Sequence, residues 1–73
     1  MTILSETLFV EKLREEPGRY VFHEMGTYTL READGSVIFE VPKQFVDNLT
    51  KAGKLLRYKN RDRRKLFPAP AFG

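Results

Sequence analysis

The fold is decided by one stretch of the chain, residues 28–41, which reads YTLREADGSVIFEV. The pair Asp34-Gly35 lies at its middle and favours a two-residue hairpin turn, because both residues accept a positive φ. The register that follows pairs Ala33 with Ser36, Glu32 with Val37, Arg31 with Ile38, Leu30 with Phe39, Thr29 with Glu40 and Tyr28 with Val41.

This register sorts the side chains of the hairpin onto two faces. The expected core face carries Tyr28, Leu30, Val37, Phe39 and Val41. The other face carries Thr29, Arg31, Ser36 and Glu40, together with Ile38. A slip of one residue would mix the two sets, so the pattern of the strands agrees with the chemistry of the turn.

A second turn at Met25-Gly26 adds residues 19–24 as a third strand. Val21 and His23 then join the core face. The opposite face becomes a candidate partner face, because aromatic groups there would be costly to leave in water. Its members are Tyr20, Phe22, Arg31 and Ile38.

Helical patterns flank this meander. Ser5 can cap a helix that runs to about Glu16, with Leu4, Leu8, Phe9 and Leu13 at helical spacing and Pro17-Gly18 as its stop. Pro42 can open a second helix that runs to about Ala52, followed by Gly53 as its C-terminal cap. Residues 55–59 and 64–67 then read as two short strands around a basic turn at residues 60–63.

The expected fold class is α+β, in the order α-β-β-β-α-β-β. An antiparallel meander packs with two helices, and the chain ends in a basic β-hairpin. Residues 1–67 form the single domain, and residues 68–73, PAPAFG, form an extended C-terminal tail. The expected core is Leu8, Phe9, Leu13, Val21, Tyr28, Leu30, Val37, Phe39, Val41, Phe45, Leu49, Leu56 and Leu66.

Size and composition set the class of protein. The chain has 73 residues and no cysteine, so neither a disulfide nor a thiolate–zinc site can staple it. No apolar run approaches the roughly 20 residues that span a bilayer, and the N-terminus lacks the basic start of a signal peptide. We therefore expect a cytoplasmic protein with no membrane partner.

The charge of the chain is sorted by position. Residues 1–50 hold five basic and nine acidic residues, whereas residues 51–73 hold eight basic residues against Asp62 alone. Such a cluster favours a polyanion as partner. The candidate nucleic-acid contacts are Lys51, Lys54, Arg57, Lys59, Arg61, Arg63, Arg64 and Lys65, with Tyr58 and Phe67 as candidates for stacking on bases.

Residues 45–67 resemble the helix–Gly–strand–basic turn–strand that ends a winged-helix DNA-binding domain. The resemblance implies a helix in the major groove, with Lys43, Gln44, Asp47, Asn48 and Lys51 exposed, and a wing that carries Arg61, Arg63 and Arg64. It covers about a third of the chain. A full winged helix has a three-helix core, where this chain offers one helix and a meander.

The sequence offers no catalytic motif. His23 is the sole histidine, the carboxylates are dispersed, and the glycines read as turns and caps rather than a phosphate-binding loop. We therefore expect no enzyme activity, no metal and no cofactor.

Two classes of function remain open. The favoured one is a small nucleic-acid-binding protein, a regulator or accessory factor, that uses the basic segment 51–65. The alternative is a protein-binding modulator of the kind that phages and plasmids encode against host machinery, which would grip an acidic protein surface through the basic hairpin and the partner face. A homodimer through Tyr20, Phe22 and Ile38 is a third arrangement.

Overall fold

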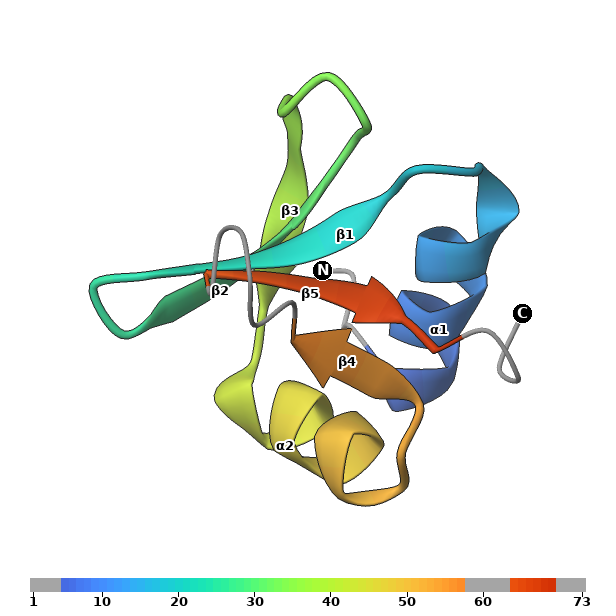
Figure 1. Cartoon of the computed structure of the whole chain (residues 1–73), viewed down its shortest axis with the longest axis vertical. Coiled ribbons are helices and arrows are strands. Elements are labelled where there is room, and N and C mark those ends of the chain that lie inside the picture. The colour runs from blue at the N-terminus through green and yellow to red at the C-terminus, as the bar shows by residue number, and fades with distance from the viewer. Residues whose placement is uncertain (1–4, 58–63, 70–73) are drawn as a thin grey trace.

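The computed structural model describes residues 5–57 and 64–69, and its elements follow the predicted order (Figure 1). They are α1 (Glu6–Glu15), β1 (Tyr20–Glu24), β2 (Thr27–Arg31), β3 (Val37–Val41), α2 (Lys43–Lys51), β4 (Leu55–Arg57) and β5 (Lys65–Pro68). The α+β class is therefore confirmed.

The strands form one antiparallel sheet in the order β3-β2-β1-β5-β4. The C-terminal hairpin is thus part of the main sheet, because β5 pairs with β1 as well as with β4 (Figure 1). Pairing of Val21 with Leu66 and of Phe22 with Lys65 fixes which residues of β1 and β5 share a face.

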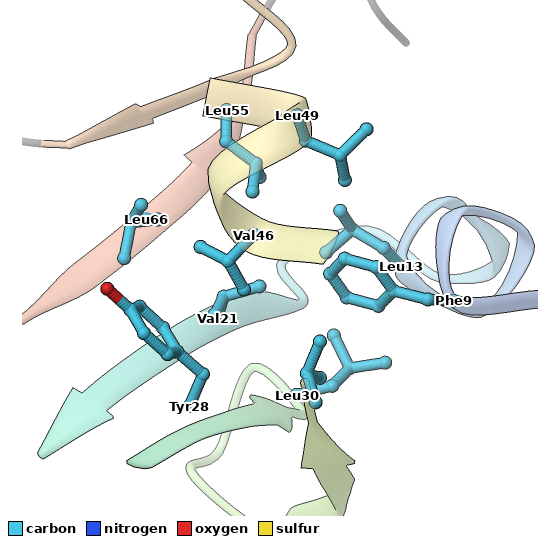
Figure 2. Packing of buried hydrophobic residues seen from close by; sticks show 10 residues of the cluster. Phe9, Leu13, Val21, Tyr28, Leu30, Val46, Leu49, Leu55 and Leu66 are labelled. Atoms are coloured by element: carbon cyan, nitrogen blue, oxygen red, sulfur yellow. The ribbon is translucent and has the colours of Figure 1, made fainter. Parts of the chain in front are cut away.

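Both helices pack on one face of the sheet, which we call the inner face. Phe9 and Leu13 of α1 and Val46 and Leu49 of α2 meet the sheet residues in a single cluster (Figure 2). The sheet contributes Val21, Tyr28, Leu30, Val41, Leu55 and Leu66. The opposite face, which we call the outer face, has no helix over it among the residues described.

The first helix begins and ends as its sequence predicts. Ser5 accepts a hydrogen bond from the backbone N–H of Leu8 at 3.0 Å, which satisfies one of the free donors at the start of α1. The helix ends before Pro17-Gly18. Gly18 has φ +85°, and a Cβ added to it would lie 2.8 Å from the Cβ of Ala33. Only glycine therefore fits where the α1–β1 connection passes Ala33.

The Met25-Gly26 turn confirms the predicted pairing of β1 with β2. Both turn residues have positive φ, 53° and 79°, and Glu24 pairs with Thr27. His23 consequently faces Tyr28, and their rings stack at 4.3 Å between centroids. This lone histidine is a packing residue of the inner face.

The Asp34-Gly35 turn differs from the prediction by one residue. The Gly35 N–H donates to the Glu32 carbonyl and the Glu32 N–H to the Ser36 carbonyl, so the loop has three residues, and within it only Gly35 has positive φ. Arg31 therefore pairs with Val37 instead of Ile38. A β-bulge then absorbs Ile38 and restores the predicted pairs from Leu30–Phe39 to Tyr28–Val41.

This shift exchanges the environments of two neighbouring residues. Val37, expected in the core, joins the face of Arg31 and is 57% exposed. Ile38, expected on the partner face, packs against the core cluster, as Phe39 does. The core assignment of Val37 and the partner-face assignment of Ile38 are both wrong for the same reason.

The last hairpin contains a second exchange. Leu55 pairs with Pro68 and Arg57 with Leu66, which places Leu55 on the inner face and Leu56 on the outer one. Leu55 is buried, while Leu56, expected in the core, is 47% exposed. The strand continues to Pro68, and the N–H of the buried Ala69 donates to the Lys54 carbonyl.

Candidate nucleic-acid interface

The outer face brings aromatic and basic side chains from three adjacent strands together. Alternation along β1 places Tyr20 and Phe22 on this face, and pairing adds Arg31 from β2 and Lys65 from β5. Phe67 lies two residues after Lys65 in β5 and so shares its face, and Arg64 directly precedes β5.

Phe22 lies against two guanidinium groups. The guanidinium carbon of Arg31 is 4.5 Å from the centroid of the Phe22 ring, and that of Arg64 is 5.3 Å from it. A second set of contacts lies alongside, where the Lys65 ammonium is 5.0 Å from the Tyr20 ring and Phe67 packs against the same ring at 5.4 Å. Cations and rings thus attract each other across the face.

Arg31 is held in place without being neutralised. Its Nε donates to the Thr29 hydroxyl at 3.1 Å, and its Nη1 donates to the Gly35 carbonyl at 3.2 Å. Among the described residues no carboxylate forms an ion pair with it. Its charge and the donors of Nη2 therefore remain available to an anion on the outer face.

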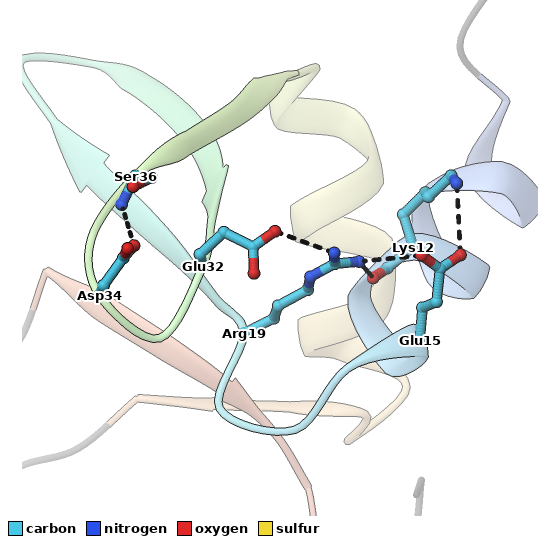
Figure 3. A network of polar contacts seen from close by, with 6 residues as sticks. All are labelled: Lys12, Glu15, Arg19, Glu32, Asp34 and Ser36. Carbon is cyan, nitrogen blue, oxygen red and sulfur yellow. Dashed lines mark hydrogen bonds and ion pairs between the residues drawn. The ribbon is translucent and has the colours of Figure 1, made fainter.

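Arg19 shows what a structural arginine looks like in the same molecule. It is 9% exposed and bonds the Lys12 carbonyl and the Glu32 carboxylate, with Glu15 at 3.7 Å (Figure 3). Its charge is thus compensated by two carboxylates. Arg31, by contrast, bonds only uncharged groups among the described residues.

A shallow hollow of about 260 Å³ opens beside Arg31 at the free end of the β1–β2 hairpin. Phe22 and Met25 give it apolar walls. The rest of its lining is polar and comes from Glu24, Thr27, Thr29 and Arg31. No local pattern in the sequence predicts this hollow, although alternation along the two strands does place Glu24, Thr27 and Thr29 on the face of Phe22.

The predicted basic residues are distributed over several places. Arg64 and Lys65 reach the aromatic rings of the outer face. Lys51 and Lys54 are exposed at the end of α2, and Arg57 is exposed on edge strand β4, opposite Leu66. Tyr58, Lys59, Arg61 and Arg63 lie outside the residues that the structure describes.

Part of each predicted site meets on the outer face because β5 lies beside β1. Phe22 and Arg31 of the partner face contact or adjoin Arg64 and Lys65 of the basic segment. Tyr20, also predicted for the partner face, is only 7% exposed and acts as support beneath Lys65 and Phe67. Phe67 is half-buried there.

Helix α2 lies on the other side of the sheet from this surface. The positions that the winged-helix resemblance singles out, Lys43, Gln44, Asp47, Asn48 and Lys51, are exposed. The side-chain amide of Asn48 donates to the Glu6 carboxylate of α1 at 3.3 Å. The hairpin that would be the wing is anchored in the sheet through β1.

Residues 5–57 and 64–69 contain no group of three or more His, Asp or Glu side chains placed to hold a metal ion. None of the helices described is long and apolar enough to cross a membrane.

Comparison with protein-family models, curated proteins and solved structures finds no match to this chain.

Proposed function

We propose that this chain is a small nucleic-acid-binding protein, a regulator or accessory factor, that uses the basic segment 51–65 and whose described contact surface is the outer face, where Arg64 and Lys65 of that segment lie. The observation that carries the proposal is the set of cation–ring contacts at Phe22 and Tyr20. Nucleic acids present phosphates to cations and flat bases to rings, and this surface offers both kinds of group side by side.

The arrangement of Arg31 strengthens the proposal. A side chain held by a ring, a hydroxyl and a carbonyl loses little further freedom when it binds a phosphate. Among the described residues, two carboxylates share the outer face, Glu24 at the end of β1 and Glu40 on edge strand β3. Glu24 lines the hollow beside Phe22 and Arg31.

The test measures binding to fluorescent oligonucleotides across a salt series. The double variant Arg31→Gln/Lys65→Gln should weaken binding and reduce the slope of log K against log salt by about 1.4–1.8, because each lost phosphate contact removes about 0.7–0.9. Lys43→Gln is the control, since it removes an exposed charge on the other side of the sheet. Absence of binding by wild type at low salt would refute the proposal.

The alternative function, a protein-binding modulator of the phage or plasmid kind, is favoured by different residues. Val37 and Leu56 are exposed apolar groups at the two edges of the outer face. A protein partner held by such groups would dissociate little with salt, whereas phosphate binding weakens steeply. A complex from lysate that survives both nuclease and high salt would favour this alternative.

The homodimer through this face loses two of its three expected members, because Ile38 packs inward and Tyr20 is buried beneath Lys65 and Phe67. Sedimentation of wild type and a Phe22→Ser variant over a wide concentration range distinguishes a dimer from a monomer.

A further inference from the structure

We infer that the outer face binds a single strand, with one unpaired base in the hollow beside Phe22 and the adjoining phosphate on Arg31. This inference rests on the proposed function and specifies the state of the nucleic acid that it binds. It starts from a juxtaposition that the charge pattern of the sequence does not show: the hollow lies next to Arg31, which forms no ion pair with another described residue.

The lining of the hollow matches the parts of a nucleobase. Phe22 and Met25 supply apolar surface for the faces of a planar ring, and the hydroxyls of Thr27 and Thr29 and the carboxylate of Glu24 supply hydrogen-bonding groups for its edge. At about 260 Å³ the hollow is smaller than the roughly 300–1,000 Å³ of sites that enclose a whole drug-sized ligand. It therefore suits one planar group of a longer molecule.

The position of Arg31 explains how the rest of that molecule would be held. Arg31 lines the hollow and also lies over the Phe22 ring, so a phosphate bonded to its Nη2 group would be next to the base. Arg64 approaches the same ring, and Lys65 is the cross-strand partner of Phe22 on β5. The strand would thus pass from the β1–β2 end of the face across to the basic segment.

A duplex fits this surface poorly. Its bases are stacked and paired, so their faces cannot reach Phe22 or enter the hollow. The major groove is read by a helix or a two-stranded ribbon that protrudes into it, whereas α1 and α2 pack on the inner face, away from Phe22. From the described residues of this surface, only phosphate contacts would remain for a duplex.

The experiment compares three fluorescent probes of equal length: a single strand, its duplex, and a single strand with abasic sites. Each is made as DNA, and the single strand also as RNA. Wild type should bind the intact single strand at least tenfold more tightly than the duplex. Phe22→Leu keeps an apolar side chain but removes the stacking ring, and it should weaken binding to the intact strand about 5- to 150-fold. It should weaken binding to the abasic strand much less, because there only the contact of the ring with Arg31 and Arg64 is lost.

Arg31→Gln provides a second variant that does not depend on the ring. It should lower the salt slope on all single strands by about 0.7, including the abasic one. Thermal melts followed by circular dichroism check that each variant is folded. Lys43→Gln, on the other side of the sheet, should match wild type on every probe.

The outcomes separate the inference from the function beneath it. If the duplex binds as well as the single strand and Phe22→Leu binds normally, the inference is wrong, while the nucleic-acid function stands. If Phe22→Leu weakens binding to the abasic strand as much as to the intact one, the ring supports the fold rather than a base, and the inference is again wrong. If no probe binds at low salt, both fail together.

Discussion

Arg19 shows how a single residue connects the layers of this molecule. Its Nη1 donates to the Lys12 carbonyl at 2.6 Å, near the end of α1, and its Nη2 donates to Glu32 at 2.9 Å, beside the β2–β3 loop (Figure 3). The sequence did not mark it as structural. Its role depends on where α1 lies against the sheet, which no local pattern specifies.

Replacing Arg19 by methionine should lower the free energy of unfolding by about 1.5–3 kcal/mol, since hydrogen bonds to a charged group are lost while the apolar length is kept. Lys43→Met, at an exposed position, should change it by less than about 0.5 kcal/mol. Urea unfolding measures both. Equal stabilities for the two variants would show that Arg19 is dispensable.

Asp34 makes the stability of the β2–β3 loop depend on pH. The backbone N–H of Ser36, the largest cause, and then its hydroxyl hold the pKa of the Asp34 carboxyl below its usual value (Figure 3). A lowered pKa means that the contribution is fully present above the ordinary Asp pKa of about 3.9 and is lost as the pH falls through the lowered value.

Asp34→Ala should therefore lower the melting temperature at pH 7, where the carboxylate accepts the Ser36 N–H. The difference between the variant and wild type should shrink as the pH falls below about 4. Thermal melts at several pH values measure this. A difference that stays constant down to pH 2 would mean that the charged form of Asp34 contributes nothing.

At the scale of the elements, two turn glycines differ in a way that can be measured. Gly18 and Gly26 both have positive φ, but a Cβ on Gly18 would meet Ala33, whereas a Cβ on Gly26 would meet nothing within 4 Å. Gly26→Ala should cost about 1–2 kcal/mol, the usual penalty of a left-handed conformation for a residue with a Cβ.

Gly18→Ala should cost more than Gly26→Ala, and the excess measures the contact between the α1–β1 connection and the β2–β3 loop. Ala33→Gly in the Gly18→Ala background should recover that excess and leave the conformational cost. Should the two glycine variants be equally stable, this close approach would carry no energy.

The β2–β3 hairpin shows how far local chemistry predicts an element. The alternation of Tyr28, Leu30, Phe39 and Val41 correctly gave most of the register. The turn type was wrong, because Asp34 takes a negative φ and the Glu32–Ser36 bonds close a three-residue loop. The bulge at Ile38 compensates for the longer loop. Together the longer loop and the bulge leave the pairs from Leu30–Phe39 to Tyr28–Val41 unchanged, so the pattern of the strands alone cannot reveal either of them.

A matched pair of variants tests the bulge. Ile38→Ser should destabilise the domain by about 1–2 kcal/mol, because Ile38 packs against the core, and Val37→Ser should be within about 0.5 kcal/mol of wild type. A two-residue loop would reverse this order, placing Val37 in the core. The free energy of unfolding of the two variants therefore decides between the two registers.

At the scale of the whole molecule, the candidate site depends on a pairing between distant parts of the chain. The aromatic residues of β1 and the basic residues around β5 are both predicted from sequence patterns, but as separate surfaces. Local patterns predict which residues form strands but not that β5 would lie beside β1, with Phe22 opposite Lys65. The prediction for β4 was wrong for a similar reason, because it placed Leu56 in the core where Leu55 lies. The two leucines are equally apolar, and only the pairing with β5 distinguishes them.

The strongly asymmetric charge leads to a prediction about the molecule as a whole. Changing Arg61, Arg63 and Arg64 together to alanine should reduce the salt slope of nucleic-acid binding by about 2–3, since each arginine is expected to meet one phosphate. The loss of affinity should be nearly independent of sequence, because phosphate contacts position a nucleic acid without specifying its bases.

Net charge alone could also lower the affinity, so the control removes the same charge elsewhere. Lys12, Arg14 and Lys43 lie on the two helices, away from the outer face, and their triple alanine variant has the same net charge as the arginine variant. Anisotropy across a salt series should show a much smaller change of slope for this control. If the two triple variants weaken binding equally, the molecule attracts nucleic acid through its overall charge and has no localised interface. If only the arginine variant weakens binding, the phosphates are bound by this cluster of arginines and not by the overall charge of the molecule.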